Sequence, residues 1–128
     1  MSKRNENTPN NSEWQGLQGL WAESPLTLMQ LVRRLNGETG WAKSTVTTLL
    51  SRMEQKGFIR YRDGGKAREY YPLVTREEVA LAETESLLSR VYNGSVGMMV
   101  NALVRQNNLS KEEISELYDI LERAEKND

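Results

Sequence analysis

The chain has 128 residues, of which 38% are hydrophobic, and this suffices for one ordinary domain or two small modules. It contains no Cys and no His, which excludes disulfide frameworks, zinc ribbons and thiol redox sensors and removes the commonest general base. The net charge of −1 hides an asymmetry, because residues 1–74 carry 11 Lys and Arg against 7 Asp and Glu, whereas residues 75–128 carry 6 against 11. The basic first part is therefore suited to binding a polyanion, whereas the acidic second part would be repelled by one and is expected to have another role.

The N-terminal region opens with a polar segment, residues 1–11, which predicts a disordered tail. No apolar signal segment opens the chain, and no run approaches the roughly 18 apolar residues of a membrane span. We therefore expect a cytoplasmic protein with no membrane partner.

Two S/T-x-x-E/Q capping boxes then mark helix starts. The first joins Ser12 to Gln15 and predicts a helix to about residue 21. The second joins Thr27 to Gln30 and predicts a helix to about residue 35, where Asn36-Gly37 would end it.

A third helix is predicted from about Ala42 to Lys56. Its apolar residues recur at i, i+3, i+4 and i+7, which is one buried stripe, and they are Val46, Leu49, Leu50 and Met53. The opposite face is rich in hydroxyl groups, whose short side chains allow close approach to base edges. Gly57 suits the left-handed position that closes a helix, with Phe58 as the apolar residue beyond it.

A hairpin follows, with predicted strands at 59–62 and 67–71. The sequence Asp63-Gly64-Gly65 supplies the positive φ angles that a tight hairpin needs. Four cations, Arg60, Arg62, Lys66 and Arg68, surround the turn.

A hydroxyl-rich helix followed by a basic hairpin is the layout of a winged helix-turn-helix, in which one helix enters the DNA major groove and the hairpin grips the backbone. The alternative is a solvated helix face and a charged hairpin tip, both common on surfaces. The clustering of cations on the helix and the hairpin favours double-stranded DNA. The candidate DNA-binding residues are Lys43, Ser44, Thr45, Thr47, Thr48, Arg52, Lys56, Arg60, Arg62, Lys66 and Arg68.

Three further helices are predicted in residues 75–128. A box of Thr75 with Glu78 opens the first, to about residue 92, and Asn93-Gly94 breaks it. The second runs from about 95 to 105, and a box of Ser110 with Glu113 opens the third. We therefore divide the chain into a tail (1–11), a winged-helix DNA-binding domain (12–74) and a helical dimerisation domain (75–128).

The dimerisation role follows from the apolar surface of the last two helices. Residues 75–128 would have little self-contained core, and a unit this short is only marginally stable alone. A second copy of the chain would bury the apolar faces of its helices. A two-fold dimer would also match an inverted-repeat operator. The alternative is that these helices pack on their own winged helix. The expected interface residues are Val96, Met99, Val100, Leu103, Leu117, Tyr118 and Leu121.

Catalytic and metal sites find no support. The carboxylate pairs Glu77-Glu78 and Glu112-Glu113 lie in first turns of predicted helices, where acids favour the macrodipole. No Gly-rich phosphate loop precedes a helix. We expect a protein that is not an enzyme and that uses no cofactor and no metal.

Several motifs carry a family resemblance. They include Ser12-Glu13-Trp14, Ser44-Thr45-Val46 with Thr48-Leu49-Leu50, Lys56-Gly57 and Val91-Tyr92-Asn93-Gly94. The chain resembles the penicillinase repressor (BlaI/MecI) family, which also includes copper-responsive CopY repressors. The resemblance covers nearly the whole chain and implies a homodimeric winged-helix repressor on an inverted repeat. It also implies DNA reading from the third helix, at Ser44, Thr45, Thr48 and Arg52.

The chain departs from that family at three places. The third helix starts Ala42-Lys43-Ser44 in place of a Pro-Lys start, and we expect this change to affect operator preference. The chain lacks the Cys-rich copper hook, which excludes copper sensing by that route. The antibiotic-resistance repressors are cleaved at an Asn-Phe bond, and the bond aligned with it here is Ala102-Leu103. An inducer protease would therefore meet a different sequence at this control bond.

The predicted fold is mainly α with a small β-hairpin: a winged helix-turn-helix followed by a three-helix C-terminal dimerisation module. The predicted function is a homodimeric transcriptional repressor that occupies a palindromic operator and controls resistance or stress-type genes. Two alternatives stay open: a winged-helix regulator that senses a small molecule in its dimer interface, and a winged-helix protein–protein adaptor.

Overall fold

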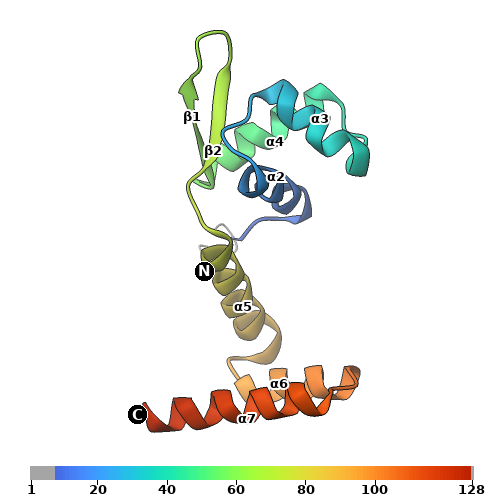
Figure 1. Cartoon of the computed structure of the whole chain (residues 1–128), viewed down its shortest axis with the longest axis vertical. Helices are drawn as coiled ribbons and strands as arrows, with labels where there is room; N and C mark the ends of the chain where they lie inside the picture. The colour runs from blue at the N-terminus through green and yellow to red at the C-terminus, as the bar shows by residue number, and fades with distance from the viewer. Residues whose placement is uncertain (1–7, 128) are drawn as a thin grey trace. The chain divides into compact units, whose positions relative to one another are not determined.

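The computed structural model describes residues 8–127, which divide into two compact units, one ending at Ser86 and the other beginning at Leu87. Figure 1 shows the elements in chain order. They are α2 (Asn11–Ala22), α3 (Leu28–Thr39), α4 (Lys43–Gln55), β1 (Ile59–Asp63), β2 (Arg68–Pro72), α5 (Arg76–Tyr92), α6 (Val96–Gln106) and α7 (Lys111–Lys126). The predicted fold class, mainly helical with one hairpin, is confirmed.

The first helix begins earlier than predicted. Asn10, not Ser12, is its N-cap: its side-chain oxygen accepts the Glu13 N–H at 2.9 Å, and Glu13 Oε1 accepts the Asn10 N–H at 2.9 Å. Asn is as good a cap as Ser, so an Asn-x-x-Glu box competes with the Ser-x-x-Gln box two residues later. Pro9 is buried, so residues 8–11 belong to the ordered unit, and the rest of the expected disordered tail lies outside the described residues.

The second helix confirms its predicted start but runs past its predicted end. Thr27 and Gln30 form the reciprocal capping box. The helix continues through Asn36-Gly37 to Thr39, and Gly40 ends it with a φ of 69°. Gly37 keeps helical geometry because a glycine inside a helix costs only about 1 kcal/mol, whereas the left-handed angle at Gly40 is where glycine is favoured.

One apolar core holds α2, α3, α4 and the hairpin together. The predicted stripe on α4 is confirmed, since all four of its residues are buried. Leu26 forms an isolated β-bridge to β2 that sequence reasoning missed: its N–H donates to the Tyr70 carbonyl at 3.0 Å and its carbonyl accepts the Tyr70 N–H at 2.8 Å. The core consists of Leu17, Leu20, Leu26, Leu31, Leu35, Val46, Leu49, Leu50, Met53, Phe58, Ile59 and Val79.

The hairpin pairs β1 with β2 in antiparallel register, with Tyr61 opposite Tyr70. At its tip Gly65 has a φ of 93°, and its N–H donates to Asp63 Oδ1 at 3.0 Å. This confirms the predicted turn at Asp63-Gly64-Gly65. The first strand ends one residue later than predicted, at Asp63, and the second is shifted by one residue, from 67–71 to Arg68–Pro72.

The start of α5 packs with the winged helix. Thr75 and Glu78 form the predicted capping box. The Trp21 Nε1–H donates to the Val74 carbonyl at 2.8 Å, the Arg76 guanidinium lies 4.9 Å above the Trp21 ring, and Val79 is buried. These contacts explain why the first unit extends beyond residue 74 to Ser86.

The second unit contains the end of α5 and the helices α6 and α7. Asn93 and Gly94 both have positive φ, at 54° and 82°, and break the chain between α5 and α6 as predicted. Ser95 and Ser110 cap the two following helices. Among the described residues, no helix is long and apolar enough to cross a membrane.

Candidate nucleic-acid interface

The face of α4 opposite its buried stripe is exposed and hydrophilic. It presents hydroxyl groups along the helix with cations at its first residue and in its last turn. Neither Lys43 nor Arg52 forms an ion pair with a described residue. The exposed residues on and beside this face are Lys43, Ser44, Thr45, Thr47, Thr48, Ser51, Arg52, Glu54 and Gln55.

Two hydroxyl groups on this face are already engaged with their own helix. Thr47 Oγ1 donates to the Lys43 carbonyl at 2.9 Å, and Thr48 Oγ1 donates to the Ser44 carbonyl at 3.1 Å. A hydroxyl has one donor and two acceptor lone pairs. Thr48 therefore presents outward a methyl group and acceptor lone pairs, which suit a thymine methyl or a base amino group.

The C-terminal end of α4 is closed as predicted. Gly57 has a φ of 83°, its N–H donates to the Glu54 carbonyl at 3.0 Å, and the Phe58 N–H donates to the Met53 carbonyl at 2.9 Å. This pair of bonds is a Schellman motif. It turns the chain from α4 into β1 with Phe58 buried, so the positions of the helix and the hairpin are linked.

Lys56, one of the DNA-binding residues predicted from sequence, is engaged in an ion pair within the protein. Its Nζ lies 2.8 Å from Glu13 Oε1, and the Glu13 side chain is completely buried. The pair joins the C-terminal end of α4 to the first turn of α2. No sequence pattern signalled it, because the two residues are 43 positions apart.

The hairpin carries its cations on two faces. The strand register places Arg60 and Arg62 on one face and Arg68 on the other. The Arg62 Nε–H lies 2.9 Å from Glu69 Oε1 in an exposed ion pair. The Arg68 guanidinium lies 4.1 Å above the Tyr61 ring, and its hydrogen bond with Tyr70 raises the pKa of Arg68. Two arginines of the hairpin, called the wing below, thus have side-chain partners on the hairpin itself.

Within the described residues, the helices α6 and α7 have no buried residue of their own. Most predicted interface residues are strongly exposed, with Val96 at 60%, Leu103 at 54% and Leu121 at 65%. Met99 and Leu117 are half-buried. A groove between the two helices is lined in part by Val100, Leu103, Val104, Leu109 and Leu117. These apolar faces are unpartnered within the described chain.

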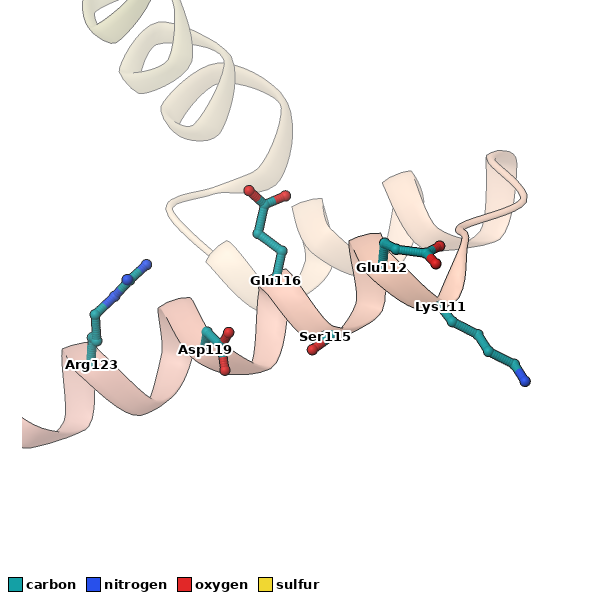
Figure 2. A pocket seen from close by; sticks show the side chains of 6 residues that line it. All are labelled: Lys111, Glu112, Ser115, Glu116, Asp119 and Arg123. Atoms are coloured by element: carbon teal, nitrogen blue, oxygen red, sulfur yellow. The ribbon is translucent and has the colours of Figure 1, made fainter.

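The opposite face of α7 is polar. Figure 2 shows six side chains around a shallow surface hollow, and all of them come from this one helix. They carry both charge signs, as expected of a solvated helix face, and they are Lys111, Glu112, Ser115, Glu116, Asp119 and Arg123. Within residues 8–127, no group of three acidic side chains is placed to hold a metal ion.

Comparison with known proteins connects this geometry to a family. Residues 10–123 match the penicillinase repressor family. The methicillin resistance regulatory protein MecI of Staphylococcus aureus is 27% identical over 112 residues, which cover 88% of this chain and 91% of that protein. The penicillinase repressor of Bacillus licheniformis is 30% identical over 111 residues, which cover 87% of each chain.

Solved structures show the same fold. The DNA-binding domain of the repressor BlaI is similar with a TM-score of 0.50 at 20% identity, over 55% of this chain and 85% of that domain. A mutant of S. aureus MepR, bound to an oligodeoxyribonucleotide, has a TM-score of 0.51 at 20% identity, over 92% of this chain and 78% of its own. The family match spans almost all described residues, and the winged helix, the closed α4 and the exposed C-terminal faces agree with it, so the chain belongs to the penicillinase repressor family.

Proposed function

We propose that this chain is a transcriptional repressor that binds an inverted-repeat operator in double-stranded DNA as a homodimer. One observation carries the proposal: the exposed hydroxyl-rich face of α4 runs directly into a basic wing, and both are held by one core. Proteins of this fold are found on DNA, including B. licheniformis BlaI in complex with the blaP half-operator. Occupying the operator excludes other proteins from it, which is sufficient for repression.

The helix α4 would supply base contacts and positioning contacts. Ser44, Thr45 and Thr48 are short and exposed, so the helix can approach base edges closely. Lys43 and Arg52 lie nearer the ends of the helix, where long cations reach phosphates. Thr47 would contribute beside them, while Lys56 is occupied by Glu13.

The wing would bind the phosphate backbone. Arg60 and Lys66 form no ion pair with a described residue, and Arg68 lies against the Tyr61 ring. Arg62 forms an ion pair with Glu69, and this pairing lowers the contribution of Arg62 to DNA affinity. These cations give affinity without sequence information.

The second copy of the chain is the proposed occupant of the apolar faces of α6 and α7. Faces this apolar are rarely left open in a monomer, and within the described residues neither helix has a buried residue. The BlaI complex named above is of a monomeric form on a half-operator, which implies that a whole operator of that protein has two such halves. A two-fold dimer here would place one α4 on each half-site.

The same region is the proposed point of control. Leu103 lies in α6 and is 54% exposed, while Ala102 is half-buried. A cut at Ala102-Leu103 would separate the winged helix from much of the dimer surface. An inducer protease that acts here would need to recognise Ala-Leu and to gain access to a helical segment.

The base-reading role of α4 is tested by comparing two substitutions. Arg52→Ala should weaken binding about equally on all DNA sequences and lower the slope of log affinity against log salt by about 1, because it removes one phosphate contact. Thr48→Val keeps the outward methyl, and Thr48→Ser keeps the hydroxyl. If the methyl contacts a base, Thr48→Ser should change sequence preference; if the hydroxyl does, Thr48→Val should change it. In either case the salt slope should stay unaltered.

Fluorescence anisotropy on operator and scrambled DNA, each over a range of salt, measures both effects. Ser115→Ala on the polar face of α7 is the matched control and should change neither quantity. If Arg52→Ala leaves affinity and slope unchanged, α4 does not read DNA as proposed.

The role of the wing is tested by removing its charge. Changing Lys66 and Arg68 to Ser should reduce affinity strongly at low salt and much less at high salt, where screening already removes the benefit. Arg68→Lys is the informative control, since it keeps the charge but loses the planar stack on Tyr61. A loss of equal size at both salt concentrations would assign these residues to hairpin structure instead.

A further inference from the structure

Glu13 is a buried acid whose bonding capacity is only partly used. Its Oε1 accepts the Asn10 N–H at 2.9 Å and the Lys56 ammonium at 2.8 Å. Its Oε2 is also buried and has no hydrogen-bond partner among the described residues. The capping role needs one acceptor oxygen, which Gln also supplies. A buried carboxylate with an unsatisfied oxygen is costly, so its charge requires a purpose other than capping α2.

The position of Lys56 in the fold indicates what the buried charge of Glu13 does. Lys56 is the C-cap of α4, immediately before Gly57 turns the chain into the wing. Its ammonium also lies 6.0 Å from the centre of the Phe58 ring. The ion pair therefore holds the one point from which both the reading helix and the wing extend.

A second contact keeps α2 close to α4 on the same side. Gly16 lies three residues after Glu13, and a Cβ at Gly16 would come within 2.9 Å of Met53 Sδ and 3.3 Å of Leu49 Cδ2. The backbone of α2 thus approaches α4 directly. A close packing distance together with one charged link restricts both the separation of the two helices and the sliding of one along the other.

We propose that Glu13 and Lys56 form a clamp that sets the position of α4 and the wing, and that this position determines discrimination between the operator and other DNA. Glu13 is then a positioning residue, 43 positions from its partner and not itself in contact with DNA. The inference rests on the proposed function, because discrimination presupposes DNA binding. The alternative is that the Lys56 ammonium contacts a DNA phosphate instead of positioning α4.

The two roles predict opposite results for Glu13→Gln in the full chain. If the pair is a clamp, Glu13→Gln and Lys56→Met each lower operator affinity by roughly tenfold, the size of one lost base contact. Both leave scrambled-DNA affinity and the salt slope unchanged, and the double variant is no worse than either single one. If Lys56 binds phosphate, Glu13→Gln frees the cation and tightens binding to all DNA, while Lys56→Met lowers the slope by about 1. That second pattern, or unchanged operator affinity in both variants, overturns the clamp.

Three controls separate positioning from folding. Val79→Ala removes buried volume from the same core but leaves both members of the Glu13–Lys56 pair in place, and it should leave the ratio of operator to scrambled affinity unchanged. Lys56→Arg keeps a cation beside Glu13. Unlike Lys56→Met, it should therefore retain the ratio of operator to scrambled affinity of the unaltered chain. Lys56 is only partly buried, so the Lys56→Met and Lys56→Arg comparison remains decisive where Glu13→Gln does not fold.

Amide chemical shifts give a readout that does not depend on DNA. In the free protein, Glu13→Gln should move the amide signals of residues 49–57, whereas Val79→Ala should leave them in place. Unmoved signals would overturn the clamp. Absence of salt-dependent DNA binding by the unaltered chain would instead refute the proposed function, while the amide shifts still decide whether the pair positions α4.

Discussion

A chain that ends at Leu103 should keep a folded winged helix but lose the operator, with affinity for the inverted repeat falling by about 10²–10⁴. The truncation removes the end of α6 and all of α7, so two copies are no longer joined. Each winged helix then binds one half-site alone and loses the gain that a linked pair obtains. A gel-shift titration of the truncated and full chains on the same inverted repeat measures the loss.

The control for this truncation restores dimerisation by other means. Fusing the shortened chain to an unrelated two-stranded coiled coil should recover a large part of the operator affinity, provided the linker spans the two half-sites. Affinity for an isolated half-site should be the same for all three proteins. Equal midpoints for truncated and full chains on the inverted repeat would show that dimerisation does not make this protein a repressor.

Replacing Leu117 and Leu121 with Asp should convert the proposed dimer into a monomer. Each substitution would place an uncompensated charge in the apolar interface, at a cost of about 3–5 kcal/mol, which corresponds to a loss of at least about a hundredfold in dimer affinity. Leu121 is 65% exposed in the single chain, so its replacement leaves the protomer intact. Sedimentation velocity over a range of protein concentrations measures the change.

A matched variant changes the same net charge on the other side of α7. Ser115→Asp with Arg123→Gln also lowers the net charge by two, and both residues lie on the polar face shown in Figure 2. This variant should sediment as the unaltered dimer. If the variant with Leu117 and Leu121 both changed to Asp still sediments as a dimer, the interface does not include these two residues.

Local signals predicted most of the helices. The boxes at Thr27, Thr75 and Ser110 are all formed, because each involves only residues three apart and needs no tertiary contact. The N-cap of the first helix was wrongly placed at Ser12 because two capping boxes overlap there, one starting at Asn10 and one at Ser12. Their local energies are nearly equal. The error at Gly37 has a related cause, since a glycine can end a helix or lie within it, and here Gly40, with a φ of 69°, ends the helix.

The candidate site was only partly predictable for a different reason. The exposed face of α4 follows from its period, which is a local property. The engagement of Lys56 by Glu13 depends on how α2 crosses α4, and the back-bonding of Thr48 depends on side-chain rotamers. Neither is encoded in spacing. The apolar faces of α6 and α7 were recognised from composition, but their occupant requires an experiment on the assembly.

Sequencing the genomic DNA that the purified full chain retains tests the central claim most directly. We expect enrichment of one inverted repeat, with half-sites separated by one helical turn, about 10 base pairs, or a multiple of it. Retention should weaken steeply as salt rises. Recovery of DNA with no shared repeat, or no retention of DNA at low salt, would contradict a dimeric operator-binding repressor.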